Sequence, residues 1–167
     1  MSMLNAACGQ RTAGWLFIYS CKHAFVPHVE SAIAALTGRA HQWQWWQQPL
    51  VDGAVRAELR WRGDFSCASR MASTLRAFPG ICAEVIVEAV RAEPARRYLL
   101  AADLGLWSSP MDPTGETLIA EAQLRKAIES DDPAAAVDIL LGRRWEEVLE
   151  PLRAAPHMKS AALLRVV

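Results

Sequence analysis

Residues 54–62 read AVRAELRWR, and from the second position onward they alternate strictly between apolar and charged side chains. Because successive side chains of a β-strand point to opposite faces, this period of two predicts a strand with one buried face and one polar face. Such strands are typical of antiparallel sheets. The apolar side carries Val55, Ala57, Leu59 and Trp61, and the polar side carries Arg56, Glu58, Arg60 and Arg62.

The flanking segments switch between strand and helix patterns. Strand patterns cover residues 14–20, 41–48 and 81–90, and helical spacing of apolar residues follows Pro27 and Phe65. The order is strand, helix, strand, strand, helix, strand. It predicts an α+β fold in which residues 13–92 form a ferredoxin-like split βαβ domain (βαββαβ), with both helices on one face of an antiparallel sheet.

Residues 95–167 change in character and predict a C-terminal β-hairpin and helices packed on the first domain. Residues 98–109 have the pattern of one extended strand, and Asp112-Pro113-Thr114-Gly115 has the composition of a turn before a returning strand at 116–119. Helical patterns then follow. The first spans about residues 121–129 with Leu124 and Ile128 inward, and the rest starts at Pro133 and is interrupted at Gly142.

Composition narrows the class of protein. The 167 residues suit one ordinary domain, and 18 basic residues balance 18 acidic ones, so the net charge of zero offers no bulk attraction to nucleic acid or to anionic lipid. The longest uncharged apolar stretch is about half of the ~20 residues that a membrane span requires. The four cysteines form no C-x-x-C pair, and no signal-peptide pattern starts the sequence, so we expect a cytoplasmic protein with reduced thiols.

Several short motifs, in their order and spacing, resemble a known family. They are Pro27-His28-Val29-Glu30, Trp45 with Gln48-Pro49, Arg56-Ala57-Glu58-Leu59 with Trp61, Asp103-Leu104-Gly105, and Leu141-Gly142 with Trp145 and Leu149-Glu150-Pro151. They resemble an uncharacterised actinobacterial family of small cytoplasmic proteins, a domain of unknown function. The resemblance implies a cytoplasmic protein, and it carries over no activity, cofactor or catalytic residue.

One edge of the predicted sheet collects polar groups, because the first and second strands end there and the fourth begins there. They are Cys21, His23, His28, Glu30, Gln48, Asp52 and Cys82. Thiolates and imidazoles are zinc ligands, but the short paired spacings of zinc sites are absent, so no metal is predicted. An enzyme that uses Cys21 as nucleophile and His28 as base is an alternative, although nothing marks an oxyanion hole. No phosphate-binding glycine motif occurs, and no cofactor is predicted.

The polar face of the predicted sheet is the other candidate surface. It carries the three arginines and the one glutamate of the quoted strand, Glu84 and Glu88 of the fourth strand, and the glutamines and Trp46 of the second strand. RNA binding on this face is a second alternative, but acidic residues interleave with the arginines, and nucleic acid is not expected. One interpretation without a function is a solvated face with cross-strand Arg–Glu pairs. Another is that the C-terminal part or a second protomer covers this face. Tryptophan and arginine are enriched at the centres of protein interfaces.

These observations predict a non-catalytic binding or regulatory module that engages a partner protein or a small ligand, with self-association left open. No catalytic residue and no membrane partner are predicted. The candidate binding residues are His28, Glu30, Gln48, Arg56, Glu58 and Trp61.

Overall fold

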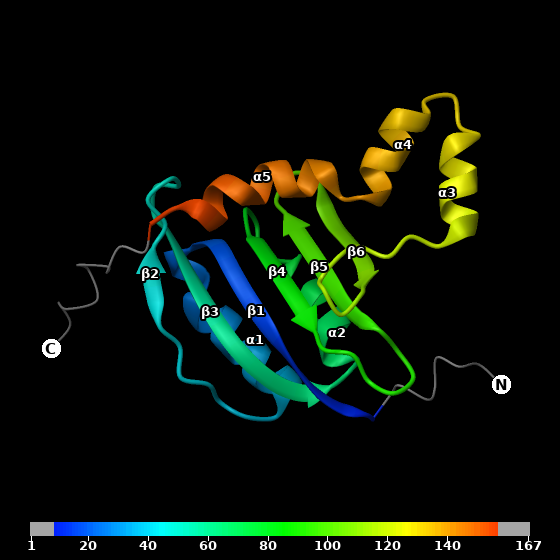
Figure 1. Ribbon diagram of the computed structural model, residues 1–167. Helices are drawn as coiled ribbons and strands as arrows, with labels where there is room; N and C mark the ends of the chain where they lie inside the picture. Colours follow the sequence, from blue (N-terminus) through cyan, green and yellow to red (C-terminus); the bar gives the residue numbers. More distant parts are fainter. Residues whose placement is uncertain (1–8, 157–167) are drawn as a thin grey trace, which may run out of the picture.

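A single antiparallel sheet organises the computed structural model, which describes residues 9–156 (Figure 1). The strands are β1 (Arg11–Lys22), β2 (Trp45–Gln47), β3 (Ala54–Asp64), β4 (Cys82–Val87), β5 (Ala95–Ala101) and β6 (Gly105–Met111). Their spatial order is β2-β3-β1-β4-β5-β6, and each neighbouring pair is antiparallel. The predicted α+β class is confirmed.

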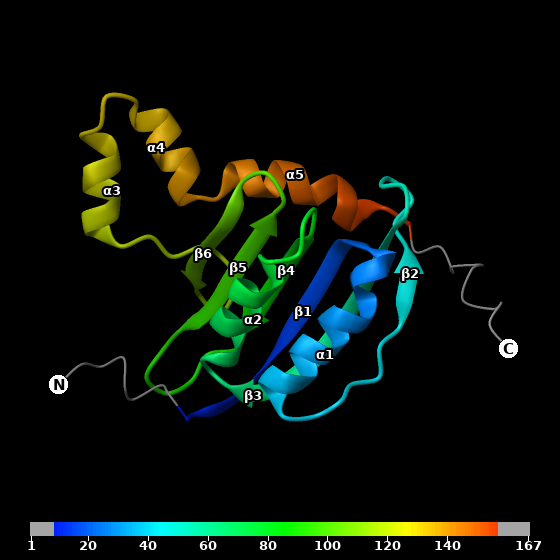
Figure 2. The ribbon, with the colours of Figure 1, turned by 180° about the vertical axis from the view of Figure 1, so that it is seen from behind.

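Two helices cover one face of this sheet, which we call the helix face (Figure 2). They are α1 (Val26–Thr37), which follows a short 3-10 turn η2 (His23–Phe25), and α2 (Cys67–Leu75). Val29 and Ile33 of α1 and Met71 of α2 are fully buried in the same apolar cluster as β1 and β3 side chains. Both predicted helices therefore lie on one side, as the sequence indicates.

The last three helices lie elsewhere. α5 (Arg143–Ala154) crosses the opposite face, which we call the second face, near the C-terminal end of β1, whereas α3 (Glu121–Ile128) and α4 (Pro133–Leu140) lie beyond the β6 edge (Figures 1 and 2). None of the helices in residues 9–156 has both the length and the apolar character that crossing a bilayer requires.

The alternation in β3 has the predicted result. Ala57, Leu59 and Trp61 are buried on the helix face, at 1%, 7% and 0% exposure. Trp61 lies opposite Gly14 of β1. A Cβ atom on Gly14 would lie 2.4 Å from the Trp61 ring and 2.0 Å from the carbonyl oxygen of Ile86, so only glycine lets the indole pack here.

The sheet differs from the prediction at its β4 side. Two further strands continue it beyond β4, so the strand order is not that of a simple split βαβ unit. The single strand predicted at 98–109 is wrong: the chain turns after Ala101 and returns at Gly105, which pairs with it. Gly105 has a φ of +76°, a conformation that glycine adopts without strain, and the short turn positions β5 beside β6.

Three other predictions from local sequence patterns hold only in part. The turn at 112–115 forms, since Asp112 Oδ1 accepts hydrogen bonds from the backbone N–H groups of Thr114 and Glu116, but only one isolated bridge follows instead of a strand at 116–119. The strand predicted at 41–48 shortens to β2. Leu124 and Ile128 of α3 are 38% and 58% exposed rather than inward, and Ala127 is the buried residue.

Candidate functional site

The second face carries its own apolar cluster, on which α5 packs. Leu149 and Leu152 of α5 pack with Tyr19, Leu99 and Trp107 from three strands. The indole of Trp107 donates a hydrogen bond to the carbonyl oxygen of Ile139 at 3.0 Å, and the indole of Trp145 donates to that of Gly105, also at 3.0 Å. The two hydrogen bonds attach the end of α4 and the start of α5 to the β5–β6 hairpin, and Leu149 and Leu152 pack the rest of α5 on the sheet.

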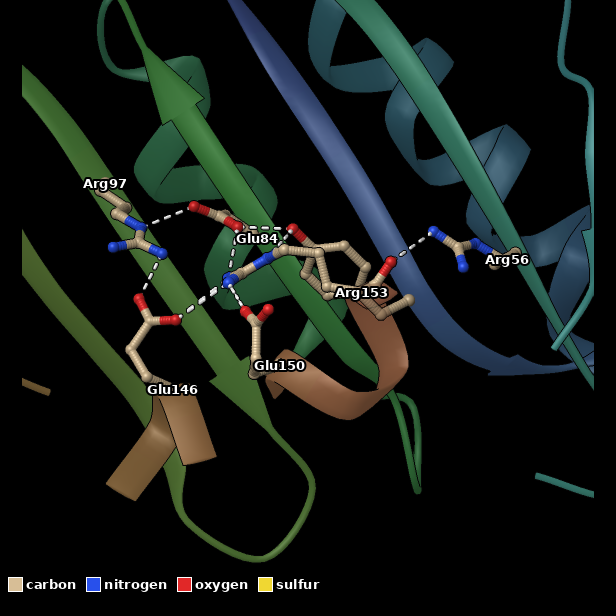
Figure 3. Close-up of polar contacts among 7 residues, drawn as sticks. Arg56, Glu84, Arg97, Glu146, Glu150 and Arg153 are labelled. Carbon is tan, nitrogen blue, oxygen red and sulfur yellow. Dashed lines mark hydrogen bonds and ion pairs between the residues drawn. The ribbon is translucent and has the colours of Figure 1, made fainter. Parts of the chain in front are cut away.

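A buried carboxylate lies at the corner between α5 and the sheet (Figure 3). Glu84 of β4 is 5% exposed. Its Oε1 accepts a hydrogen bond from Arg97 Nε at 2.6 Å, and its Oε2 accepts from the Tyr19 hydroxyl at 2.6 Å and from Arg153 Nη2 at 3.2 Å. Each oxygen is thus satisfied, as a buried carboxylate requires.

Arg153 and Arg97 connect this carboxylate to the acidic side of α5 (Figure 3). Arg153 Nη1 lies 3.1 Å from Glu146 Oε2 and 2.5 Å from Glu150 Oε2, and Arg97 also pairs with Glu146. Burial, and then the charge of Glu84, raise the pKa of the Tyr19 hydroxyl, so the phenol stays protonated and donates. The network is a set of closed ion pairs and hydrogen bonds that attaches α5 to the sheet.

Two of the predicted binding residues, Gln48 and Arg56, hold the C-terminal end of α5. Arg56, 2% exposed, donates from Nη1 to the carbonyl oxygens of Leu152 at 3.2 Å and Ala155 at 2.8 Å. Gln48 Nε2 donates to the carbonyl oxygens of Tyr19 at 2.6 Å and Leu152 at 3.2 Å. A cation at a helix C-terminus satisfies unpaired carbonyls and the helix dipole, so the partner of these residues is this chain's own helix.

The other four candidates are dispersed. His28 is exposed in the first turn of α1, and Glu30 of the same helix accepts a hydrogen bond from the Trp45 indole at 2.8 Å. Trp61 is fully buried in the helix-face core, with its Nε1 lacking a hydrogen-bond partner. Glu58 is exposed on the second face. The structure therefore does not gather the six candidates into one site.

The ends of β1 and β4 meet as expected, with Ser20 paired to Cys82, but the side chains of Cys21 and Cys82 lie on opposite faces of the sheet. Cys21 is buried in the helix-face cluster, whereas Cys82 belongs to the cluster on the second face. Burial raises the pKa of the Cys21 thiol to about 11, which is the opposite of what a nucleophilic cysteine needs. Cys8 lies outside the described residues. Among residues 9–156, no three or more His, Cys, Asp or Glu side chains are grouped to hold a metal ion.

The part of the second face that α5 leaves uncovered carries a row of aromatic rings along β1. Trp15 stacks on Phe17 with ring centroids 5.7 Å apart, and Phe17 stacks on Tyr19 at 6.1 Å. Tyr19 is buried beside α5, but Trp15 is 39% exposed. The Arg60 guanidinium lies over the Trp15 ring, 5.3 Å from its centroid. Alternate aromatic residues at 15, 17 and 19 were a sequence signal for this row, hidden in a run that is apolar on both faces.

We call this uncovered surface the open strip and define it as Trp15, Phe17, Glu58, Arg60 and Ile86. Where it meets α5, a shallow cavity of about 320 Å³ is lined by Phe17, Tyr19, Arg56, Glu58, Glu84, Ile86, Arg97 and Arg153. The lining combines Phe17, Glu58 and Ile86 of the strip with charged side chains of the network around Glu84. Its size is at the lower end of the range of small-ligand sites, about 300–1,000 Å³.

Comparison with known proteins identifies a family whose function is unknown. Residues 15–165 match the family described as "Protein of unknown function (DUF3145)". No curated protein and no solved structure matches the chain significantly.

Proposed function

The chain belongs to DUF3145, a family of proteins of unknown function, and we propose that this member is a binding module without catalytic activity that engages a small ligand or a partner protein through the open strip. The observation that carries the proposal is the exposure of Trp15. It continues a stacked row whose other end, Tyr19, is covered by α5. Exposed tryptophan beside arginine is the composition of interface centres.

The enzymatic alternative has less support. It needs an activated Cys21 with His28 and Glu30, but Cys21 is 1% exposed with a raised pKa, and Glu30 is hydrogen-bonded to Trp45. Reactive cysteines occupy exposed, electropositive surroundings. We therefore keep the binding hypothesis for this protein.

Three finer interpretations accompany the proposal. A ferredoxin-like unit formed by β1 to β4 with α1 and α2 is supported by the order β2-β3-β1-β4 within the sheet. A division into residues 13–92 and 95–167 is supported by the change of composition near Pro94. A cytoplasmic location and an actinobacterial origin rest on the motif resemblance.

Nuclear magnetic resonance of the full chain tests the binding surface. Each of the seven tryptophan indoles contributes one N–H signal, and the signal that disappears in Trp15→Leu is that of Trp15. Mixtures of metabolites and short peptides are added to the labelled protein. We expect binders to shift the Trp15 signal and amides of β1, β3 and β4, and to lose affinity in Trp15→Leu.

A matched control and a dilution series complete this test. Arg70 is an exposed arginine on α2, and Arg70→Ala should leave every shift unchanged. Shifts at Trp15 that depend on protein concentration, without any additive, would identify a second copy as the partner. Binders that shift only helix-face signals, or an open strip that responds neither to additives nor to concentration, would refute the proposal.

A further inference from the structure

A second cavity opens on the second face at the N-terminal end of β1, next to Trp15. It measures about 380 Å³ and is lined by Arg11, Thr12, Ala13, Arg60, Arg62 and Glu88. It is separate from the cavity at the α5 corner, with which it shares no lining residue. We call it the arginine cavity.

The lining charge of the arginine cavity favours an anion. Three guanidiniums face one carboxylate. Arg60 pairs with Glu88 at 2.5 Å, but the two side chains are 39% and 52% exposed, so this pair is weak and open to competition. Arg11 and Arg62 are exposed and make no ion pair within residues 9–156. Asp64 lies opposite Arg11 in the strand register but does not line the cavity.

The strand register brings the guanidiniums together over a small residue. Arg62 lies opposite Ala13 and Arg60 lies opposite Trp15, while Arg11 precedes Ala13 by two positions on the same face. Diagonal neighbours across antiparallel strands are about 7–8 Å apart, within the reach of long side chains. The methyl group of Ala13 leaves room between them. A guanidinium donates two parallel hydrogen bonds to two oxygens of a phosphate, so arginines in a cavity bind the phosphate and also fix its orientation.

Trp15 adds a second, different contact at the rim of the same cavity. Arg60 belongs to both, since its guanidinium lies over the Trp15 ring and also lines the cavity. Phe17 stacks on the Trp15 ring and the Arg60 guanidinium lies over it, so an incoming base would stack on the indole in place of the exposed Arg60 side chain. Bases stack on aromatic side chains irrespective of their sequence. A phosphate on the arginines would therefore place an attached base near this ring.

We propose that the arginine cavity binds a phosphate group and that Trp15 stacks on an aromatic base attached to it, so the ligand class is a nucleotide. This inference rests on the proposed function, because Trp15 and Arg60 belong to the open strip. The recognised chemistry is the same in a free mononucleotide and in one unit of a single-stranded nucleic acid.

Calorimetric titration of the full chain with the four ribonucleoside monophosphates, with adenosine and with inorganic phosphate tests the ligand class. We expect at least one monophosphate to bind about tenfold tighter than its parts, since each loses one of the two contacts. Arg62→Ala should weaken the monophosphate about tenfold and leave adenosine unchanged, and Arg62→Lys should recover part of the loss. Trp15→Leu should weaken monophosphate and adenosine alike, and Arg70→Ala should change neither.

A hexaribonucleotide of adenosine distinguishes the two sources of the ligand. Tighter binding than the monophosphate, with affinity that falls steeply as salt is added, would identify a nucleic-acid strand. Equal binding would identify the free nucleotide. Both results support the nucleotide class.

Two outcomes would overturn the inference. In the first, neither the monophosphates nor the hexanucleotide bind at millimolar concentration. In the second, they bind, but Arg62→Ala and Trp15→Leu leave the affinity unchanged. If another compound shifts the Trp15 signal in these cases, the binding surface stands and only the nucleotide class fails. If nothing shifts it, the proposed function fails as well.

Discussion

Replacing Glu84 with glutamine tests whether the buried network holds α5 on the sheet. The carboxylate is 5% exposed and accepts hydrogen bonds from Tyr19, Arg97 and Arg153. Glutamine keeps the shape but removes the charge, and its amide nitrogen donates instead of accepting. At least one of the three donors would then face another donor.

The expected loss of stability in Glu84→Gln depends on the contacts that Arg97 and Arg153 keep. Removing one partner of a buried ion pair costs about 3–5 kcal/mol when the other charge is left uncompensated. Arg97 and Arg153 keep Glu146, and their side chains are 18% and 31% exposed, so solvent and the second carboxylate compensate part of the loss. We expect the free energy of unfolding to fall by about 2 kcal/mol, and Tm by about 4–8 °C for a chain of this size.

The assay is urea denaturation followed by circular dichroism, with hydrogen exchange to locate the change. Glu88→Gln is the matched control, because it breaks the exposed pair with Arg60 and should alter stability by no more than about 0.5 kcal/mol. In Glu84→Gln, amide exchange should rise in α5 more than in α1. Equal losses for the two variants, or unchanged exchange in α5, would refute the assigned role of the network.

Three further predictions concern packing, capping and the thiols. Gly14→Ala should lower the free energy of unfolding by about 3 kcal/mol, because the new Cβ atom would lie 2.0 Å from a backbone oxygen. Gly63→Ala should cost less, because the nearest atom is the side-chain Sγ of Cys67 at 2.9 Å. Equal losses of the two variants in urea denaturation would contradict this prediction. Arg56→Met leaves carbonyl oxygens of Leu152 and Ala155 without their guanidinium donor and should cost about 2 kcal/mol, with hydrogen exchange rising first in the last turn of α5; a uniform rise would count against the cap. Cys21, with a pKa of about 11 against an ordinary 9.0, should react with iodoacetamide about 100-fold more slowly than a free thiol at pH 8.5, measured by peptide mass spectrometry. Because burial raises the pKa of the Cys21 thiol, its contribution to the stability of the fold is fully present below pH 9 and is lost as the pH rises through 11. Labelling of the native protein at the rate of a free thiol would contradict the burial of Cys21.

Features that depend on neighbouring residues were predictable from the sequence. The period of two in β3 placed Leu59 and Trp61 on the buried face, and the helix that starts near Pro27 ends at Gly38, whose φ is +73°. The turn at Asp112 forms because its side chain bonds the backbone two and four residues later. Each of these signals acts within a few residues, so one chain segment suffices to show it.

The candidate site was only partly predictable. Gln48 and Arg56 were predicted as binding residues, and in the structure they bind carbonyl groups at the C-terminal end of α5, about a hundred positions later in the chain. The Asp103-Leu104-Gly105 segment did not reveal the β5–β6 turn, because residues on both sides have the same extended pattern. Trp61 was offered as a binding residue and is a core residue instead.

By itself, the sequence determined the α+β class, the two faces of β3 and the side of the sheet that α1 and α2 cover, because alternation and helical spacing are local consequences of backbone geometry. Only the tertiary structure decided that α5 covers one end of the second face and leaves Trp15 exposed, and that Cys21 and Cys82 lie on opposite faces. Those outcomes depend on which distant segments compete for the same apolar surface, and burial there is settled by the whole packed chain rather than by any stretch of it.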